Sequence, residues 1–261
     1  INEVKIHNVP KICHVIQKNV FQTWKTQNFP QKIEKISHEK WISKFDDLMK
    51  LEFDKVINSD LNPSKKGLTM GESIIAINEQ TNGEAIIVTD VGQHQMVACR
   101  YANFIHSKSN ITSGGLGTMG FALPAAMGAK MGAMNREVVA VIGDGGYQMT
   151  IQELGTIFQL QIPVKIVILN NDFLGMVRQW QQLFFDKRYA STEMINPDFV
   201  TIAKGYYLDS ERVNDRKDLR PAVERMIKSK KPYVLEICVE KEDNVFPMIP
   251  SGASVSDVRL S

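Results

Sequence analysis

The chain has 261 residues, enough for one large domain or for one domain with a fragment of another. With 43% hydrophobic residues, 23% charged residues and a net charge of +2, it has the composition of an ordinary globular protein and lacks the basic surface of a nucleic-acid binder. Three scattered cysteines exclude a disulfide framework, and no stretch resembles a signal peptide or a membrane span. We expect a cytoplasmic protein with neither a nucleic-acid nor a membrane partner.

The first 60 residues differ from the rest, being rich in Lys, Gln, Asn and aromatic residues. They predict helices over residues 10–26 and 38–57, followed by a polar linker over residues 58–67. Because the chain begins with Ile1, we expect it to be part of a longer protein.

From residue 69 onward, strands alternate with helices. Apolar runs predict strands over residues 84–92, 137–146, 163–172 and 232–240. Helical spacing predicts helices over residues 69–83, 123–134, 150–161, 174–185, 198–206 and 218–231, the first ending at an Asn-Gly cap. Continuous apolar strands that alternate with helices indicate the α/β class, a doubly wound, three-layer fold in which helices cover both faces of a parallel sheet.

Polar, glycine-bearing loops follow three of these strands, at "TDVGQHQ", "GDGGYQ" and "NNDFLG". In such sheets, ligands bind beyond the carboxyl ends of the strands, so we expect the three loops to meet at one edge. Thr150 and Glu153 have the spacing of a capping box, which predicts that a helix begins just after "GDGG".

Asp144 and Asn171 are the candidate metal ligands. A carboxylate, an amide oxygen and a main-chain carbonyl suit Mg²⁺, which is often bound by few protein groups together with substrate phosphates. A lone "GDG" after a strand is usually only a turn. Two such polar ends, separated by the 24 residues 146–169, favour a magnesium-diphosphate site.

These phrases resemble a known motif. "GDG" followed by "NN" is similar to the thiamine-diphosphate motif, and further phrases follow in order: "VGQHQM", "SGGLGTMGFALPAAMGAKM", "VILNNDFLGMVRQWQ", "NPDF" and "VFPMIPSGAS". Together they closely resemble the C-terminal cofactor-binding domain of the acetohydroxyacid synthase (acetolactate synthase) catalytic subunit. The resemblance implies a thiamine-diphosphate-binding domain over residues 41–261 and a remnant of the preceding middle domain over residues 1–40.

The resemblance also implies roles for individual residues. Mg²⁺ would be bound by the side chains of Asp144 and Asn171 and by the main-chain carbonyl of Phe173. The cofactor would contact Gln93, His94, Gly117, Met119, Gly143, Asp144, Gly145, Gly146, Asn171, Phe173, Gly175 and Met176.

Three apolar residues would act in catalysis. Met119 matches the family residue that wedges beneath the cofactor and bends it into a V, while the carbonyl of Gly117 would hold the 4′-amino group. Met176 and Trp180 lie four residues apart on one helix face and would line the substrate pocket. Without the family phrases, each would be a core residue.

The implied reaction is decarboxylation of pyruvate and carboligation to pyruvate or 2-ketobutyrate, giving 2-acetolactate or 2-aceto-2-hydroxybutyrate for branched-chain amino acid biosynthesis. The full enzyme would contain FAD, bound mostly outside these residues. It would form a homodimer or tetramer through its N-terminal domain, with a possible regulatory small subunit. Because the family's essential glutamate lies in that N-terminal domain, we expect these 261 residues alone to be inactive.

Three alternatives remain. The chain could come from another thiamine-diphosphate enzyme of 2-keto acids, of the glyoxylate carboligase or pyruvate oxidase type, although "GMVRQWQ" and "NPDF" argue against it. It could be a non-catalytic half-subunit that binds the cofactor for a partner. A nucleotide-binding doubly wound domain fits poorly, because "GGLGTMG" follows no clear strand in the sequence.

Overall fold

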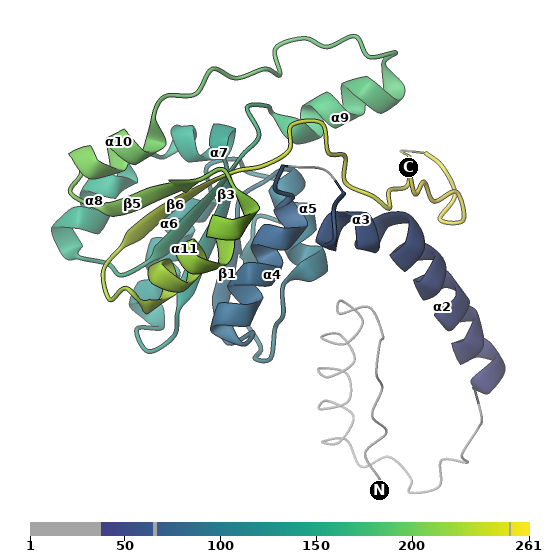
Figure 1. Cartoon of the computed structure of the whole chain (residues 1–261), viewed down its shortest axis with the longest axis horizontal. Helices are drawn as coiled ribbons and strands as arrows, with labels where there is room; N and C mark the ends of the chain where they lie inside the picture. The colour runs from purple at the N-terminus through teal and green to yellow at the C-terminus, as the bar shows by residue number, and fades with distance from the viewer. Residues whose placement is uncertain (1–37, 65–66, 251) are drawn as a thin grey trace, which may run out of the picture. The chain divides into compact units, whose positions relative to one another are not determined.

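A single parallel sheet organises the chain. The computed structural model describes residues 38–64, 67–250 and 252–261. Six strands pair in the order β2-β1-β3-β4-β6-β5, and every pair is parallel (Figure 1). In chain order the strands are β1 Ile86–Thr89, β2 Asn110–Thr112, β3 Val138–Gly143, β4 Lys165–Asn170, β5 Asp209–Val213 and β6 Tyr233–Cys238.

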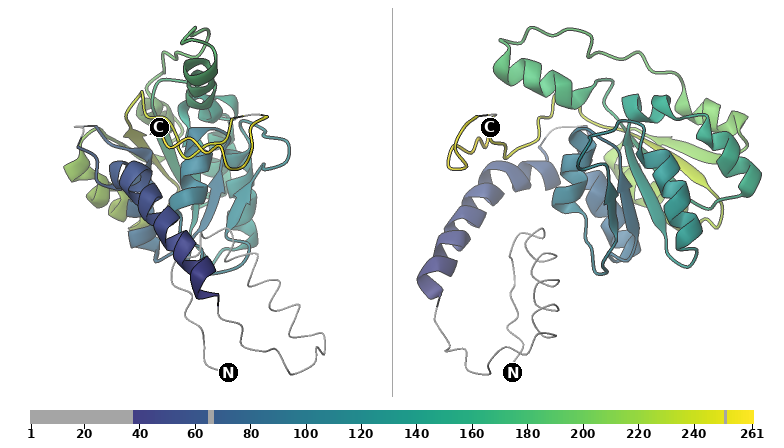
Figure 2. Two further views of the ribbon diagram at one scale, coloured as in Figure 1. Left: turned by 90° about the vertical axis from the view of Figure 1, so that its right-hand side faces the viewer. Right: turned by 180° about the vertical axis from the view of Figure 1, so that it is seen from behind.

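Helices cover both faces of this sheet (Figure 2). One hydrophobic cluster joins the sheet to α4 (Met70–Thr81), α5 (Gln93–Tyr101) and α11 (Arg216–Lys228). A second cluster lies on the opposite face with α6 (Ala122–Gly132), α7 (Asp144–Met149), α8 (Glu153–Leu160) and α10 (Phe199–Gly205). Alternate strand residues enter opposite clusters, so Val139 and Val141 face one and Ala140 and Ile142 the other. The predicted three-layer α/β class is confirmed.

The four predicted strands are present as β1, β3, β4 and β6, but the sequence did not predict β2 or β5. Both lie at an edge of the sheet. β2 has three residues, none of them buried, and β5 has the sequence DSERV with one buried residue, Val213. Edge strands bury little apolar surface, so they lack the continuous apolar run by which the central strands are identified.

Two local predictions about the site loops are wrong. A helix, α7, starts directly at Asp144, and Thr150 forms no capping box with Glu153, because its hydroxyl donates to the carbonyl of Gly120 at 3.1 Å. "GGLGTMG" does follow a strand, the short β2. The predicted Asn-Gly helix end is confirmed, since Asn82 caps α4 in the left-handed region at φ 49°.

The chain divides into two units, with the boundary between Lys50 and Leu51. The helix predicted over residues 38–57 is present as α2 (Glu39–Glu52) and a π-helical turn, η1 (Phe53–Ile57), followed by α3 (Asn58–Leu61). The helix predicted over residues 10–26 lies outside the described residues, and the domain boundary at residue 40 stays a prediction. Within the described ranges, no helix is both long and apolar enough to cross a membrane.

Candidate functional site

The site is built where three neighbouring strands end. β1 ends at Thr89 and is followed by Asp90, β3 ends at Gly143 before Asp144, and β4 ends at Asn170 before Asn171. Because β3 pairs with both β1 and β4, the three loops start side by side on one edge of the sheet. The sequence-based prediction that these loops converge is confirmed.

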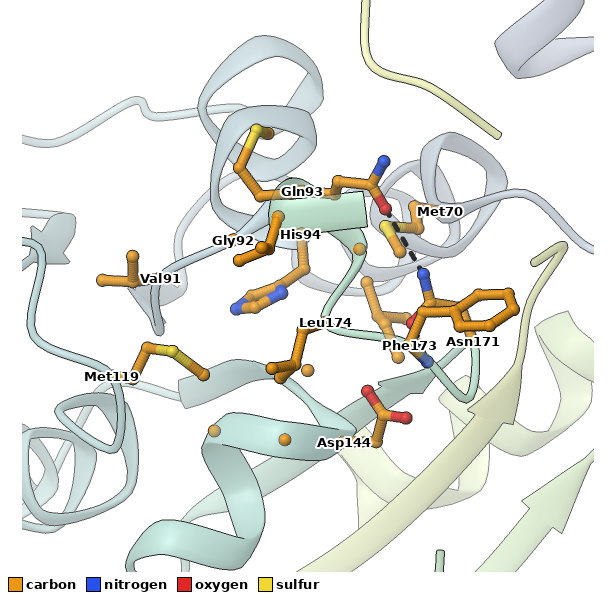
Figure 3. Close-up of a pocket in the computed structure, with 17 residues that line it drawn as sticks. Met70, Val91, Gly92, Gln93, His94, Met119, Asp144, Asn171, Phe173 and Leu174 are labelled. Atoms are coloured by element: carbon orange, nitrogen blue, oxygen red, sulfur yellow. Dashed lines mark hydrogen bonds between the residues drawn. The ribbon is translucent and has the colours of Figure 1, made fainter. Parts of the chain in front are cut away.

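A cavity of about 160 Å³ lies between these loops (Figure 3). Its lining includes most of the residues that the sequence selected, namely Gln93, His94, Met119, Gly143, Asp144, Gly145, Gly146, Asn171, Phe173, Gly175 and Met176. It also includes residues to which the sequence assigned no role, namely Met70, Val91, Gly92, Leu169, Leu174 and Val177. Gly117 and Trp180 are absent from the lining.

Asp144 is a buried carboxylate with few partners. Its side chain is 1% exposed, and Oδ2 accepts a hydrogen bond from Nδ2 of Asn196 at 2.7 Å. Burial raises the pKa of Asp144 to about 6, although the bonds from Asn196 and from the main chain of Gly145 oppose the shift. A buried anion that its own protein only partly satisfies favours a cation beside it.

Asn171 and Phe173 stand next to Asp144 at one end of the cavity in Figure 3. Between them, Asp172 takes a left-handed conformation at φ 56°, which turns the chain sharply after β4. The amide nitrogen of Asn171 donates to Oε1 of Gln93 at 3.3 Å, and its Oδ1 accepts from the main-chain N–H of Phe173 at 3.3 Å. Both contacts are long, so the Asn171 side chain is held weakly.

The candidate metal ligands are mainly neutral oxygens. In the part of the chain that the structure describes, no group of three or more His, Cys, Asp or Glu residues could hold a metal. Asp144, Asn171 and the carbonyl of Phe173 include only one such residue, and they match the hard oxygen set that Mg²⁺ prefers. Any Mg²⁺ here would therefore require further oxygens from a ligand or water.

Gln93 links the cavity to a distant part of the chain. Its Nε2 donates to Oε1 of Gln179 on α9 (Gly175–Phe184) at 2.9 Å and to the carbonyl of Asp243 at 2.9 Å. A Cβ on Gly175 would lie 2.1 Å from Oε1 of Gln93, so a glycine leaves room for this amide. The Gln93 side chain is fixed by the protein before any ligand binds.

His94 lies between the two ends of the cavity in Figure 3 and has an unpaired ring nitrogen. It is 5% exposed, and its Nε2 has no hydrogen-bond partner among the residues that the structure describes. Burial lowers the pKa of His94 to about 4, with Asp90 opposing the shift, so the ring is neutral at pH 7. A buried, unsatisfied nitrogen at the wall of a cavity is suited to contact a polar ligand.

The glycines around Asp144 make room for side chains of the protein itself. A Cβ on Gly143 would approach the His94 ring to 2.8 Å, and one on Gly146 would come within 2.7 Å of Oδ1 of Asp90. A Cβ on Gly145 would meet Cδ2 of Leu174 at 2.6 Å. The close packing of this loop is therefore sufficient reason for its glycines, whatever they offer to a ligand.

Met119 lies at the opposite end of the cavity from Asn171 (Figure 3). Its loop is held by Asp90, which is fully buried and accepts from the main-chain N–H groups of Gly120 and Ala122, both at 3.0 Å. Asp90 also accepts from the N–H of Val91 at 2.8 Å. Three main-chain donors fix this carboxylate and, with it, the backbone that directly follows Met119.

Gly117 and Trp180 lie outside the cavity wall. Gly117 is exposed with φ 62°, a conformation that favours glycine, and nothing would contact a Cβ there. Trp180 is 36% exposed and packs on Phe184 at a ring-centroid distance of 4.9 Å. Met176, one turn earlier on α9, lines the cavity. The catalytic roles of these residues stay predictions.

Sequence reasoning gave no individual role to Asp90, Gln179 or Asn196. Asp90 follows a buried strand as Asp144 does, and Asn196 begins the phrase "NPDF", so both had a usable signal. No local signal in the sequence indicated Gln179. A polar residue on an amphipathic helix is normally exposed, whereas Gln179 is 1% exposed.

Comparison with known proteins adds three findings. Residues 90–237 match a family model described as the thiamine pyrophosphate enzyme, C-terminal TPP binding domain. The chain is 43% identical over 183 residues to the acetolactate synthase isozyme 2 large subunit of Escherichia coli, covering 70% of this chain and 33% of that protein. It is 41% identical over 196 residues to the acetolactate synthase large subunit of Lactococcus lactis, covering 75% of this chain and 33% of that protein.

A solved structure has a similar fold. The thiamine diphosphate-dependent 4-hydroxybenzoylformate decarboxylase of Rhodococcus jostii superposes with a TM-score of 0.64 and 26% identity, covering 69% of this chain and 34% of that chain. The chain thus spans about a third of the length of the relatives that it matches.

Proposed function

The chain belongs to the thiamine pyrophosphate enzymes, of which it contains the C-terminal cofactor-binding domain, and from this we propose that its cavity binds the diphosphate end of the cofactor together with Mg²⁺. The family model spans every loop that lines the cavity except the part of α4 that contributes Met70. The observation that supports the metal is the oxygen set of Asp144, Asn171 and Phe173 at one end of that cavity.

The residues at this end fit a magnesium diphosphate. Asp144 would supply the one anionic ligand, and its incomplete hydrogen bonding leaves it able to accept a cation. Asn171 would supply Oδ1, which is held only by a 3.3 Å bond, and Phe173 would supply its main-chain carbonyl. Two ligands so close in sequence restrict the position of the ion to the turn after β4.

The diphosphate would lie between the metal ligands and α5. His94 would face it through Nε2, the nitrogen that has no hydrogen-bond partner among the described residues. Gln93 lies one residue before His94 at the start of α5, and Gly145 and Gly146 would allow close approach to their main-chain N–H groups. Gly143 and Gly175 would contribute by making room for His94 and Gln93.

The ring end of the cofactor would lie toward Met119. When bound, thiamine diphosphate supplies the electron sink for breaking a carbon–carbon bond next to a keto group. Met119 would support the bent form of the cofactor, because Asp90 fixes the backbone directly after it, at Gly120 and Ala122. Gly117 would contribute its carbonyl, and Met176 and Trp180 on α9 would border the substrate. Helix α9 begins only four residues after Asn171, so one short segment would position both the metal ligands and the residues that border the substrate.

We infer that the protein to which this domain belongs is an acetolactate synthase. It would join pyruvate to a second 2-keto acid, pyruvate or 2-ketobutyrate, as the names of the relatives at 41–43% identity suggest. FAD, a dimer or tetramer and a regulatory small subunit would belong to regions beyond this domain. Trp180 would favour 2-ketobutyrate only modestly, since one methylene is worth about 1–3 kcal/mol.

Calorimetric titration tests the cofactor assignment. Thiamine diphosphate is expected to bind the protein in the presence of Mg²⁺ and not in the presence of a chelator. Equal binding in both conditions would contradict a metal-linked site. Analysis of the products formed from pyruvate by the protein with all its domains then tests the reaction. Acetolactate is the expected product, while acetaldehyde or acetyl phosphate would indicate a different thiamine-diphosphate enzyme.

A further inference from the structure

One amide group connects three segments at the metal end of the cavity. Nδ2 of Asn196 donates to Oδ2 of Asp144 at 2.7 Å, to Oδ1 of Asn170 at 3.0 Å and to Oδ1 of Asp172 at 3.1 Å. Asp144 starts α7 and Asn170 ends β4, while Asp172 forms the left-handed turn that follows β4. The two chain segments that contain the candidate metal ligands are thus tied together by a side chain from a third segment.

The orientation of this amide is fixed by a residue on α7. Nε2 of Gln148 donates to Oδ1 of Asn196 at 2.9 Å. An asparagine amide could otherwise turn over and present its oxygen to the carboxylates, which would repel it. Gln148 lies four residues after Asp144, so the same short helix bears both a candidate metal ligand and the group that aims Asn196 at it.

Asp172 is the other acid at this position, but its oxygens are already paired. Oδ1 accepts from Asn196 at 3.1 Å, and Oδ2 lies 2.6 Å from Nζ of Lys241. Among the described residues, Asp144 has the Asn196 amide as its side-chain donor, on Oδ2, and it also accepts from the main chain of Asp144 and Gly145. The charge of Asp172 is therefore balanced by Lys241, whereas no ion pair involves Asp144 in the part of the chain that the structure describes, which leaves Asp144 as the carboxylate available to a cation.

We propose that Asn196 is a positioning residue for the divalent cation, acting through Asp144 and through the turn that precedes Asn171 and Phe173. Its amide sets the rotation of the Asp144 carboxylate and fixes the distance between that carboxylate and the end of β4. Both quantities decide whether the carboxylate and the Asn171 oxygen can share one ion, and Mg²⁺ tolerates little departure from octahedral geometry. This role rests on the proposed magnesium-diphosphate site.

Two calorimetric affinities test the role in the full protein. In Asn196→Ala, the affinity for Mg²⁺ at saturating thiamine diphosphate is expected to fall about 10–100-fold, the usual loss when a group that orients a metal ligand is removed. The affinity for thiamine diphosphate at saturating Mg²⁺ should recover, because the cofactor contacts themselves are intact. Gln148→Leu, which keeps Asn196 but frees its amide to turn, should weaken Mg²⁺ binding by less. It also serves as the test variant if Asn196→Ala does not fold.

Asn214→Ala is the matched control. Asn214 lines the same outer hollow as Asn196, Asp172 and Lys241, and it is exposed. Its removal should leave Mg²⁺ affinity unchanged.

Electron paramagnetic resonance of bound Mn²⁺ adds a second readout. The signal should change in Asn196→Ala and not in Asn214→Ala, because only the former alters the surroundings of the ion. If folded Asn196→Ala and Gln148→Leu bind Mg²⁺ with wild-type affinity, or lose only thermal stability, the positioning role is overturned while the metal site stands. A wild-type protein that binds thiamine diphosphate without any metal would overturn the proposed function and this role together.

Discussion

Two buried aspartates, Asp90 and Asp144, follow neighbouring strands of one sheet and differ in how the protein satisfies them. Asp90 accepts three main-chain hydrogen bonds, from Val91, Gly120 and Ala122. Asp144 accepts from the side chain of Asn196 and from the main chain of its own turn, at Asp144 and Gly145, and burial still raises its pKa to about 6. The comparison separates structure from function. The bonds to Asp90 join two distant loops and stabilise the fold, whereas the buried charge of Asp144 costs stability that a bound cation could offset.

Removing Asp90 should have the largest effect. Asp90→Ala leaves the N–H groups of Gly120 and Ala122 without acceptors in a buried place, and we expect the free energy of unfolding to fall by about 3 kcal/mol. Urea denaturation without cofactor measures it. Asp209→Ala, at an exposed position of β5, is the control and should change little. A loss no greater than that of the control would contradict the structural role of Asp90.

Removing Asp144 should affect binding and spare the fold. Because burial disfavours its charged form, Asp144→Ala should unfold at pH 7 with the wild-type free energy or a higher one. Its affinity for thiamine diphosphate in the presence of Mg²⁺ should fall at least about 100-fold, or about 2.7 kcal/mol. Denaturation and calorimetry on the same preparation provide both values. If Asp144→Ala lost as much stability as Asp90→Ala, the contrast between the two aspartates would be wrong.

The pH dependence of stability should reveal His94. Its pKa of about 4 in the native protein is below the usual 6.5, so between these values the unfolded chain binds a proton that the native chain does not. Stability should therefore fall as pH is lowered from 6.5, by about 2 kcal/mol at pH 5 from this residue. Denaturation at pH 7 and at pH 5 should show that His94→Asn loses this part of the dependence. An unchanged dependence would mean that another group is responsible.

Gly143→Ala should give the smallest loss and test the packing between the two aspartate loops. The added methyl group would meet the His94 ring at 2.8 Å, and we expect a cost of about 1–2 kcal/mol in unfolding free energy. In a double variant with His94→Ala most of that cost should disappear. Gly128→Ala, in α6 with nothing within 4 Å of the new Cβ, should be neutral or stabilising. Equal costs with and without His94 would place the strain elsewhere.

The sequence predicted the central strands and the converging loops because both have a local signal. A run such as "VVAVIG" is buried on both faces, and the polar residues that follow it must lie at the strand end. The edge strand β5 has no such run, because Val213 is its one buried residue.

The sequence predicts Asp144 and Asn171 as candidate ligands, but it does not predict the hydrogen bonds that connect the site. Asp144 and Asn171 could be found from the residues next to them. The bonds from Gln93 to Asp243 and from Asn196 to Asp144 join residues 150 and 52 positions apart, and no local pattern specifies such pairs. Only the folded chain shows that Asp90 accepts from a distant loop and that burial disfavours the charge of Asp144.

The most direct test of the central claim is a crystal structure of the protein with thiamine diphosphate and Mn²⁺, in which anomalous scattering locates the ion. We predict one Mn²⁺ coordinated by a carboxylate oxygen of Asp144, Oδ1 of Asn171 and the carbonyl oxygen of Phe173. An ion bound elsewhere, with these three oxygens too far apart to share it, would contradict the assignment of the metal site and of the cofactor orientation that depends on it.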